Sequence, residues 1–198
     1  MSYDADATRR RIFEAAADEF AERGLAGARI ERIATAARAN KQAIYLYFGN
    51  KQQLFGAVLK AKMEEVCHEG PLDPHAMGES VGQLFDWYHE HPELVRLLMW
   101  EALELSPDEP LAADERRRTY RAYASEMTEG GYAAGEPDED ARIRAAQDWL
   151  FTVLGLVAWN FCVPQMRALV LDEPDAKAAL ARRREVVVQT VKALAAAR

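Results

Sequence analysis

Residues 30–51 read IERIATAARANKQAIYLYFGNK, and this stretch decides the fold of the N-terminal part of the chain. It predicts two short helices, Ile30–Ala37 and Lys41–Tyr47. Apolar residues recur at helical spacing in the first, and Asn40 is a good N-cap for the second. Two short helices joined by a tight turn predict a helix-turn-helix. In that motif the first helix braces the second, whose N-terminal residues enter the major groove of DNA.

The second short helix carries side chains that can read or hold DNA. Lys41 can donate to guanine O6 and N7, and Gln42 can pair with adenine through two hydrogen bonds. The hydroxyls of Tyr45 and Tyr47 can reach phosphates at the far end of the helix. Lys51 opens the following helix, where its charge and the free backbone amides favour an anion. We therefore expect a DNA interface on these side chains.

Helices are expected on both sides of this pair. Apolar residues at helical spacing predict one over residues 8–23, which Gly24 is placed to end. Asn50 and Gln53 form a capping-box pattern at the start of another helix, which continues to about His68. A break follows at residues 70–74. Because that helix joins the two parts of the chain, we place the domain boundary along it.

Charge is unevenly distributed along the sequence. The net charge is −7, yet residues 1–60 carry 10 Lys and Arg against 7 Asp and Glu, whereas residues 61–198 carry 15 against 25. Residues 23–60 contain seven basic residues and one acidic residue, Glu31. A phosphate-binding surface needs only a local positive field, because salt screens charges beyond about 10 Å. The acidic remainder also has a plainer interpretation, since it favours solubility and weakens non-specific DNA binding.

The second half of the chain is also predicted to be helical, with Pro164 kinking or interrupting a long apolar helix over residues 141–171. Its aromatic side chains can line an apolar pocket or simply fill the core. Four residues fall on helices expected to surround a cavity, and we predict that they bind a ligand: Trp100, Tyr123, Met127 and Trp159. Ordinary core packing is the alternative for each of them.

Two apolar stripes are candidates for contact with a second copy of the chain. The first consists of Val153, Leu154, Val157 and Trp159, and the second of Val187, Val191 and Leu194. Two helices from each subunit would form a four-helix bundle. An intrachain core is the alternative. We expect a homodimer because the first stripe lies in an unusually apolar run and a DNA site read by such a motif is paired.

Other classes of protein find little support in the sequence. The longest uncharged run, residues 149–163, is shorter than the ~20 residues that cross a bilayer, so no membrane association is expected. Cys67 and Cys162 are far apart, and together with the absence of a signal segment they predict a reducing, cytoplasmic location. His89 and His91 point in different directions on a helix, so no metal site is expected. No spacing typical of catalytic groups occurs, and we expect no catalytic residue and no cofactor.

The segment RRRIFEAAADEFAERGLAGARIERIATAARANKQAIYLYFGNKQQLFGAVL resembles the N-terminal domain of the TetR/AcrR family of bacterial transcriptional regulators. The resemblance covers about residues 8–60 and depends on FAERG, a following Ile-Ala pair, and the pattern Y-x-YF-x-NK-x-x-L. It implies an all-α fold, with a three-helix DNA-binding domain, a connecting helix and a C-terminal helical domain for ligand binding and dimerisation. By position, it implies DNA contacts from Lys41, Gln42, Tyr45, Tyr47 and Lys51.

The chain departs from the family pattern around the second helix. Ala28 and Arg29 stand where the family usually has Ser or Thr at the helix cap, and Arg29 can replace that phosphate contact by charge. Arg38 stands where the tight turn usually has Gly, and a non-Gly residue with positive φ costs about 1 kcal/mol. Asn40 replaces a usual Ser and caps equally well. Arg29 and Asn40 therefore join the expected DNA-binding residues.

Together, the sequence and the resemblance predict a ligand-responsive transcriptional regulator that binds double-stranded DNA as a homodimer. The resemblance favours a repressor that a small-molecule effector releases from a palindromic operator. Residues 1–55 are the expected DNA-binding domain, and residues 56–198 the ligand-binding and dimerisation domain. The alternative is a DNA-binding regulator without a small-molecule ligand, whose C-terminal domain docks a protein partner.

Overall fold

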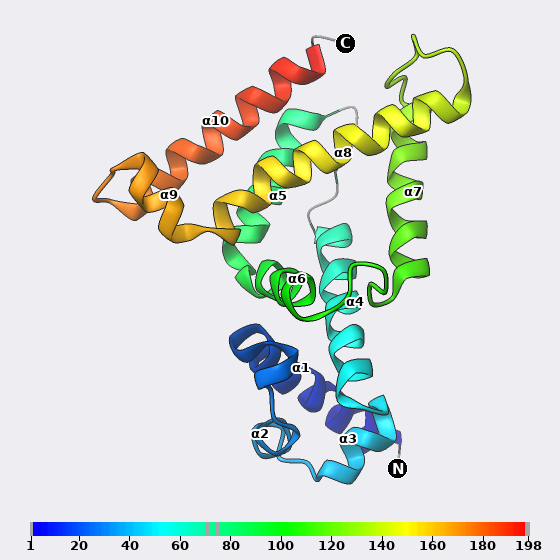
Figure 1. The fold of residues 1–198 in the computed structure, drawn as a ribbon, viewed down its shortest axis with the longest axis vertical. Coiled ribbons are helices and arrows are strands. Elements are labelled where there is room, and N and C mark those ends of the chain that lie inside the picture. The colour runs from blue at the N-terminus through cyan, green and yellow to red at the C-terminus, as the bar shows by residue number, and fades with distance from the viewer. Residues whose placement is uncertain (1, 70–71, 74–75, 197–198) are drawn as a thin grey trace. The chain divides into compact units, whose positions relative to one another are not determined.

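The computed structural model describes residues 2–69, 72–73 and 76–196, and the regular structure within them consists of ten α-helices (Figure 1). The helices are α1 Ser2–Gly27, α2 Ile30–Ala36, α3 Lys41–Phe48, α4 Lys51–Glu69, α5 Met77–Glu90, α6 Pro92–Glu104, α7 Ala113–Glu129, α8 Glu139–Cys162, α9 Pro164–Leu171 and α10 Ala176–Ala196. The predicted all-α fold is confirmed. Of the break expected at residues 70–74, positions 70, 71 and 74 lie outside the described residues.

One compact unit consists of residues 1–64 and 93–113 and includes α1, α2, α3 and α6. Both α2 and α3 pack against α1 and against each other, which is the predicted helix-turn-helix on its supporting helix. Phe20 of α1 meets Phe55 of α4 edge to face, with ring centroids 5.1 Å apart. Other fully buried apolar side chains of this unit include Ile12, Ile33, Ile44, Leu54 and Val58.

Helix α1 is kinked at Gly24 near its C-terminal end. Gly24 has φ 70° and ψ −179°, a backbone conformation open essentially to glycine alone. The sequence predicted that Gly24 ends the helix. Instead Gly24 interrupts it, and the chain continues to Gly27 before the Ala28 N–H closes the segment on the Gly24 carbonyl at 3.2 Å. The kink leaves the carbonyl of Ala21 free to accept hydrogen bonds from other helices.

The turn between α2 and α3 keeps a left-handed residue although it lacks glycine. Arg38 has φ 50°, so the expected strained conformation is present at this position. The Ala37 carbonyl just before it accepts a hydrogen bond from Arg11 Nε of α1 at 3.2 Å. Contacts from α1 therefore hold the turn in a geometry that a non-glycine residue would not adopt alone.

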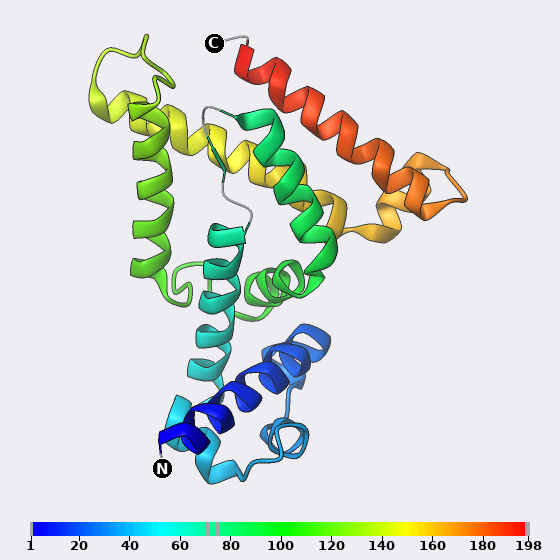
Figure 2. The ribbon, with the colours of Figure 1, turned by 180° about the vertical axis from the view of Figure 1, so that it is seen from behind.

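The second compact unit consists of residues 65–92 and 114–198, in which α5 packs against both α8 and α10 (Figure 2). The close approach of α10 to α5 depends on Gly82, where an added Cβ would lie 2.8 Å from Arg184 Nη2. The Arg184 guanidinium passes over Gly82 and binds both carboxylate oxygens of Asp86 at 2.7 Å. This two-pronged ion pair fixes the register of α10 along α5.

Pro164 separates two helices instead of kinking one. Helix α8 ends at Cys162, α9 begins at Pro164, and their axes differ in direction by 87°. In the described ranges, no single helix has both the length and the apolar character needed to cross a bilayer. The bent pair of α8 and α9 meets those two criteria only when both helices are taken together.

Candidate nucleic-acid interface and effector groove

Helix α3 is presented as an exposed, capped helix. Asn40 has extended backbone at the N-cap, and its Oδ1 accepts the Ala43 N–H at 2.7 Å, so the predicted cap is confirmed. Only Ile44 of this helix is fully buried, and it anchors the helix to the core. Lys41 and Gln42 are exposed at the N-terminal end. The outer face continues through Tyr45 and Leu46, whose side chains are 50% and 80% exposed.

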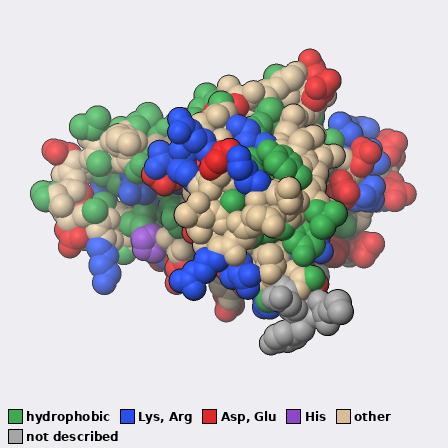
Figure 3. All heavy atoms as spheres, turned by 90° about the horizontal axis from the view of Figure 1, so that it is seen from below, with side chains coloured by type: hydrophobic (Ala, Val, Ile, Leu, Met, Phe, Trp, Pro, Cys, Tyr) green, Lys and Arg blue, Asp and Glu red, His purple; other side chains and the backbone are tan. Residues whose placement is uncertain are grey.

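The surface around α2 and α3 is basic, with one acidic group placed against the N-terminus of α3. Figure 3 shows several groups of Lys and Arg side chains on the face seen from below. The ammonium of Lys41 donates to the carboxylate of Glu31, which lies in the first turn of α2. This hydrogen bond lowers the pKa of Glu31 and raises the pKa of Lys41. Both groups therefore stay charged at neutral pH.

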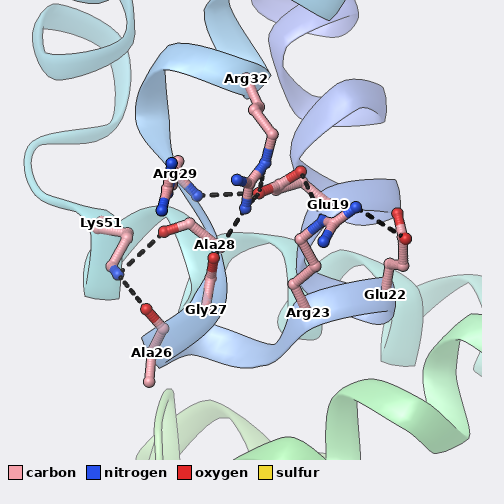
Figure 4. Close-up of polar contacts among 9 residues, drawn as sticks. All are labelled: Glu19, Glu22, Arg23, Ala26, Gly27, Ala28, Arg29, Arg32 and Lys51. Carbon is pink, nitrogen blue, oxygen red and sulfur yellow. Dashed lines mark hydrogen bonds and ion pairs between the residues drawn. The ribbon is translucent and has the colours of Figure 1, made fainter.

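The start of α2 has no side-chain cap, and Glu19 of α1 serves in its place. Arg29 occupies the N-cap with extended backbone, and its N–H donates to Glu19 Oε1 at 2.9 Å (Figure 4). Arg32 Nε donates to the same oxygen at 2.7 Å. Burial alone would raise the pKa of Glu19, but the hydrogen bonds from Arg32 and from the Arg29 N–H outweigh it, and the pKa is lowered. Glu19 therefore braces α1 against α2 as a carboxylate.

Lys51 of α4 holds residues 26–28, which lead into α2. Its Nζ donates to the carbonyls of Ala26 and Ala28, at 3.3 and 3.2 Å (Figure 4). The predicted capping box beside it is confirmed, because the Gln53 N–H donates to Asn50 Oδ1 at 2.8 Å and the Asn50 N–H donates to Gln53 Oε1 at 2.9 Å. In this structure the Lys51 ammonium is engaged within the chain, and its contact with a phosphate stays a prediction.

Helix α6 contacts the end of α1 through three polar side chains. Arg96 Nε and Trp100 Nε1 both donate to the carbonyl of Ala21, at 2.7 and 3.3 Å. The Ala26 N–H donates to Glu104 Oε2 at 2.8 Å. The structure thus places Trp100, one of the predicted ligand residues, against α1. This set of contacts had no sequence signal beyond the glycine at position 24, whose kink exposes the accepting carbonyl.

The other predicted site residues are distributed over both units. Arg29 is exposed, and Tyr47 is half-buried, with its ring 6.4 Å from that of Phe48. In the second unit Met127 is fully buried, whereas Trp159 is 56% exposed on α8. Trp100 belongs to the first unit, and the other three predicted ligand residues belong to the second, where Tyr123 lines the groove described next.

A groove in the second unit has a volume of about 510 Å³ and includes Tyr123 in its lining. Cys67 near the end of α4 forms one side, and one face of α7 with Tyr123 and Glu126 forms another. The Tyr123 hydroxyl donates to the Cys67 carbonyl at 3.4 Å, and burial raises the pKa of Tyr123, so the phenol stays neutral. Asp73 adds a second carboxylate. This lining offers hydrogen-bond acceptors beside an aromatic ring.

The apolar stripes predicted to contact a second copy divide into two groups. Val153, Val157, Val187 and Val191 are buried within the chain, so the intrachain alternative holds for them. Leu154 is half-buried, whereas Trp159 and Leu194 stay exposed. Other large apolar side chains on α8, α9 and α10 are exposed with them: Phe151 on α8, Met166, Leu169 and Val170 on α9, and Val186 on α10. The second unit thus carries uncovered apolar surface on α8, α9 and α10.

These features define a class of protein: an all-helical protein that exposes the second helix of a helix-turn-helix on a basic surface and has a groove in a separate helical unit. In the described ranges, no three His, Cys, Asp or Glu side chains converge in a way that could hold a metal ion. Comparison with known proteins then identifies the family. Residues 12–58 match the family described as bacterial regulatory proteins of the tetR family, and residues 77–192 match the tetracycline repressor-like C-terminal domain.

Relatives and solved structures agree with this assignment. The HTH-type transcriptional repressor SCO4008 of Streptomyces coelicolor is 41% identical over 173 residues, covering 87% of this chain and 88% of that protein. The HTH-type transcriptional repressor NicS of Pseudomonas putida is 40% identical over 106 residues, half of each chain. The crystal structure of SCO4942 from Streptomyces coelicolor superposes with a TM-score of 0.74 at 29% identity, over 94% of this chain and 97% of that one. The chain belongs to the TetR family and is a DNA-binding transcriptional repressor.

Proposed function

We propose that this repressor binds a palindromic operator as a homodimer and leaves it when a small molecule occupies the groove beside α7. Residues 1–55 act as the DNA-binding domain, and residues 56–198 act as the ligand-binding and dimerisation domain. The protein works in the cytoplasm as a regulator and not as an enzyme. The exposed, capped α3 is the observation that carries the DNA-binding part of this proposal.

Base reading is assigned to the N-terminal end and outer face of α3. Lys41 and Gln42 are exposed there, and a carboxamide pairs with adenine through two hydrogen bonds. Tyr45 lies one turn further along, half-exposed, where its hydroxyl can reach a phosphate. Asn40 and Arg29 flank the helix as exposed polar groups. Tyr47 and Lys51 are half-buried, and we assign them mainly to holding α3 and the 26–28 segment in position.

Substituting Gln42 tests this assignment. An operator is first selected from a pool of random-sequence duplexes, and affinity is measured by fluorescence anisotropy at fixed salt. Gln42→Ala should weaken operator binding by about 5- to 150-fold, because a good bidentate base contact contributes ~1–3 kcal/mol of discrimination. Gln52→Ala is the matched control, since Gln52 is also exposed but lies on α4. Equal affinities for the two variants would contradict the assignment.

The effector part of the proposal rests on the groove and on the continuity of α4. Cys67, which lines the groove, lies on the same unbroken helix as Lys51, which holds the 26–28 segment. A ligand that displaces the C-terminal end of α4 would therefore act on the support of α3. A coupling of ~1–3 kcal/mol would change operator affinity about 5- to 150-fold. A protein of the same fold, FadR of Bacillus subtilis, was crystallised with stearoyl-CoA (TM-score 0.64, 20% identity).

A thermal-shift screen tests the effector site. A compound that binds the native state raises the melting temperature by mass action. Tyr123→Ala should remove that shift, whereas Arg121→Ala, an exposed change on the same helix, should keep it. The same compound should lower operator affinity in the wild-type protein. A compound that shifts both variants equally would place the effector site elsewhere.

A further inference from the structure

We propose that Glu31 sets the DNA specificity of this protein by acting through Lys41. Its carboxylate holds the Lys41 ammonium of α3 away from DNA phosphates. The protein therefore binds non-specific DNA more weakly than it would without Glu31. The operator is affected less, because there base acceptors compete for the same ammonium. This inference rests on the proposed reading of DNA by α3.

The pair joins an acidic residue and a basic residue that are each single in their part of the sequence. Glu31 is the single acidic residue among residues 23–60, where there are seven basic residues. Lys41 is the single cation in α3, at its first position. The carboxylate lies in the first turn of α2, and it reaches across the turn between the two helices to the Lys41 ammonium.

Both partners are accessible, so their pairing bears on DNA more than on folding. The side chains are 51% exposed for Lys41 and 63% exposed for Glu31. An exposed ion pair adds little to stability, because solvent and salt screen it. Core residues and the Asn40 cap already hold α3 in place. The pair is therefore better explained by what the Lys41 ammonium does when DNA arrives.

Counterion release affects binding to random-sequence DNA and binding to the operator to different extents. Non-specific affinity comes almost entirely from cations that neutralise phosphates. Each such contact steepens the slope of the logarithm of the binding constant against the logarithm of salt concentration by about 0.9. A lysine already neutralised by a carboxylate contributes little of this. In the operator complex, guanine O6 and N7 accept from a correctly placed lysine, and that interaction offsets the loss of the carboxylate. Glu31 thus weakens binding to random sequence more than binding to the operator.

The test compares Glu31→Gln with Glu22→Gln on selected operator and on random-sequence duplex at several salt concentrations. The two carboxylates are 63% and 64% exposed, and Glu22 pairs with Arg23 on α1 instead of with α3, so both variants gain the same net charge. Glu31→Gln should bind random DNA more tightly and should steepen its salt slope by about one. Its gain in affinity for random DNA at 50 mM salt should exceed its gain at 200 mM by about 3.5-fold. Equal effects of the two variants would overturn the proposal.

The Lys41→Met background tests whether Glu31 acts through Lys41. In that background Glu31→Gln should leave the affinity for random DNA and its salt slope unchanged. An effect that persists without Lys41 would show that Glu31 acts by itself, which contradicts the proposal. Failure of the proposed function looks different. In that case the wild-type protein would select no sequence, or Gln42→Ala would bind the selected DNA normally, whatever the Glu31 variants do.

Discussion

Glu19 lies on the buried side of α1 and still carries a negative charge. Its carboxylate accepts hydrogen bonds from the Arg29 N–H and from Arg32, and these bonds lower its pKa despite burial. The sequence showed that Arg29 stands where the family usually has a capping Ser or Thr, but it did not identify what replaces the cap. The partner is supplied by another helix ten residues earlier, so local capping patterns could not reveal it. The available signal was a carboxylate three residues after buried Ala16, on the apolar face of α1.

Glu19→Ala should destabilise the protein by about 1–3 kcal/mol at pH 7, because a part-buried N–H and a guanidinium lose their acceptor. The folded-state pKa of Glu19 lies below its ordinary value of 4.5. The contribution of its charge is therefore fully present above pH 4.5 and is lost as the pH falls through the folded-state pKa. Urea unfolding at pH 7 and at successively lower pH should show the two proteins converging. Glu22→Ala is the control, and a pH-independent difference would contradict this role.

The helices themselves were predictable from the sequence because their signals are local. Asn40 caps α3, and Asn50 with Gln53 begins α4, as the capping patterns indicated. The behaviour of α1 at Gly24 was not predictable in the same way. Glycine indicates that a helix can end, but only the contacts from α6 show why it bends there and continues. Similarly, Pro164 indicated an interruption but not the 87° change in helix direction that accompanies it.

Gly24→Ala should destabilise the first unit by about 2–4 kcal/mol. The backbone conformation at Gly24 costs a non-glycine residue ~1–3 kcal/mol. In addition, an added Cβ would lie 2.6 Å from Glu104 Oε1 and 2.8 Å from Trp100 Cδ2. Thermal unfolding should show the loss. Gly27→Ala is the matched control, because its Cβ would meet only Arg23 Cβ at 3.5 Å. Equal melting temperatures for the two variants would mean that α6 does not hold the kink.

At the scale of the whole molecule, one copy of the chain leaves apolar surface uncovered. Phe151 is 81% exposed, and it shares α8 with Trp159. Large exposed apolar patches on soluble domains mark contact surfaces. The sequence predicted pairing on the last long helices but selected several residues that fill the intrachain core. Periodicity shows that a helix has an apolar face, but it does not show which part of that face another helix of the same chain covers.

Phe151→Glu should convert the proposed dimer into monomers without unfolding the chain, because the side chain makes few contacts within one copy. Operator affinity should fall with it, since a paired site binds two linked helices far better than one. Sedimentation equilibrium measures the first effect and anisotropy the second. Leu103→Glu provides the comparison, because Leu103 is 71% exposed but belongs to α6 of the first unit. A Phe151→Glu protein that stays dimeric would move the interface elsewhere.

The spacing of the operator tests the central claim most directly. Two copies of α3 held by one dimer must meet successive major grooves on the same side of the duplex, one helical turn of about 10–10.5 base pairs apart. Inserting five base pairs at the centre of the selected palindrome rotates one half-site to the opposite side. Affinity measured by anisotropy should then fall to that of an isolated half-site. Affinity equal to that of the unmodified palindrome would contradict recognition by a symmetric pair of α3 helices.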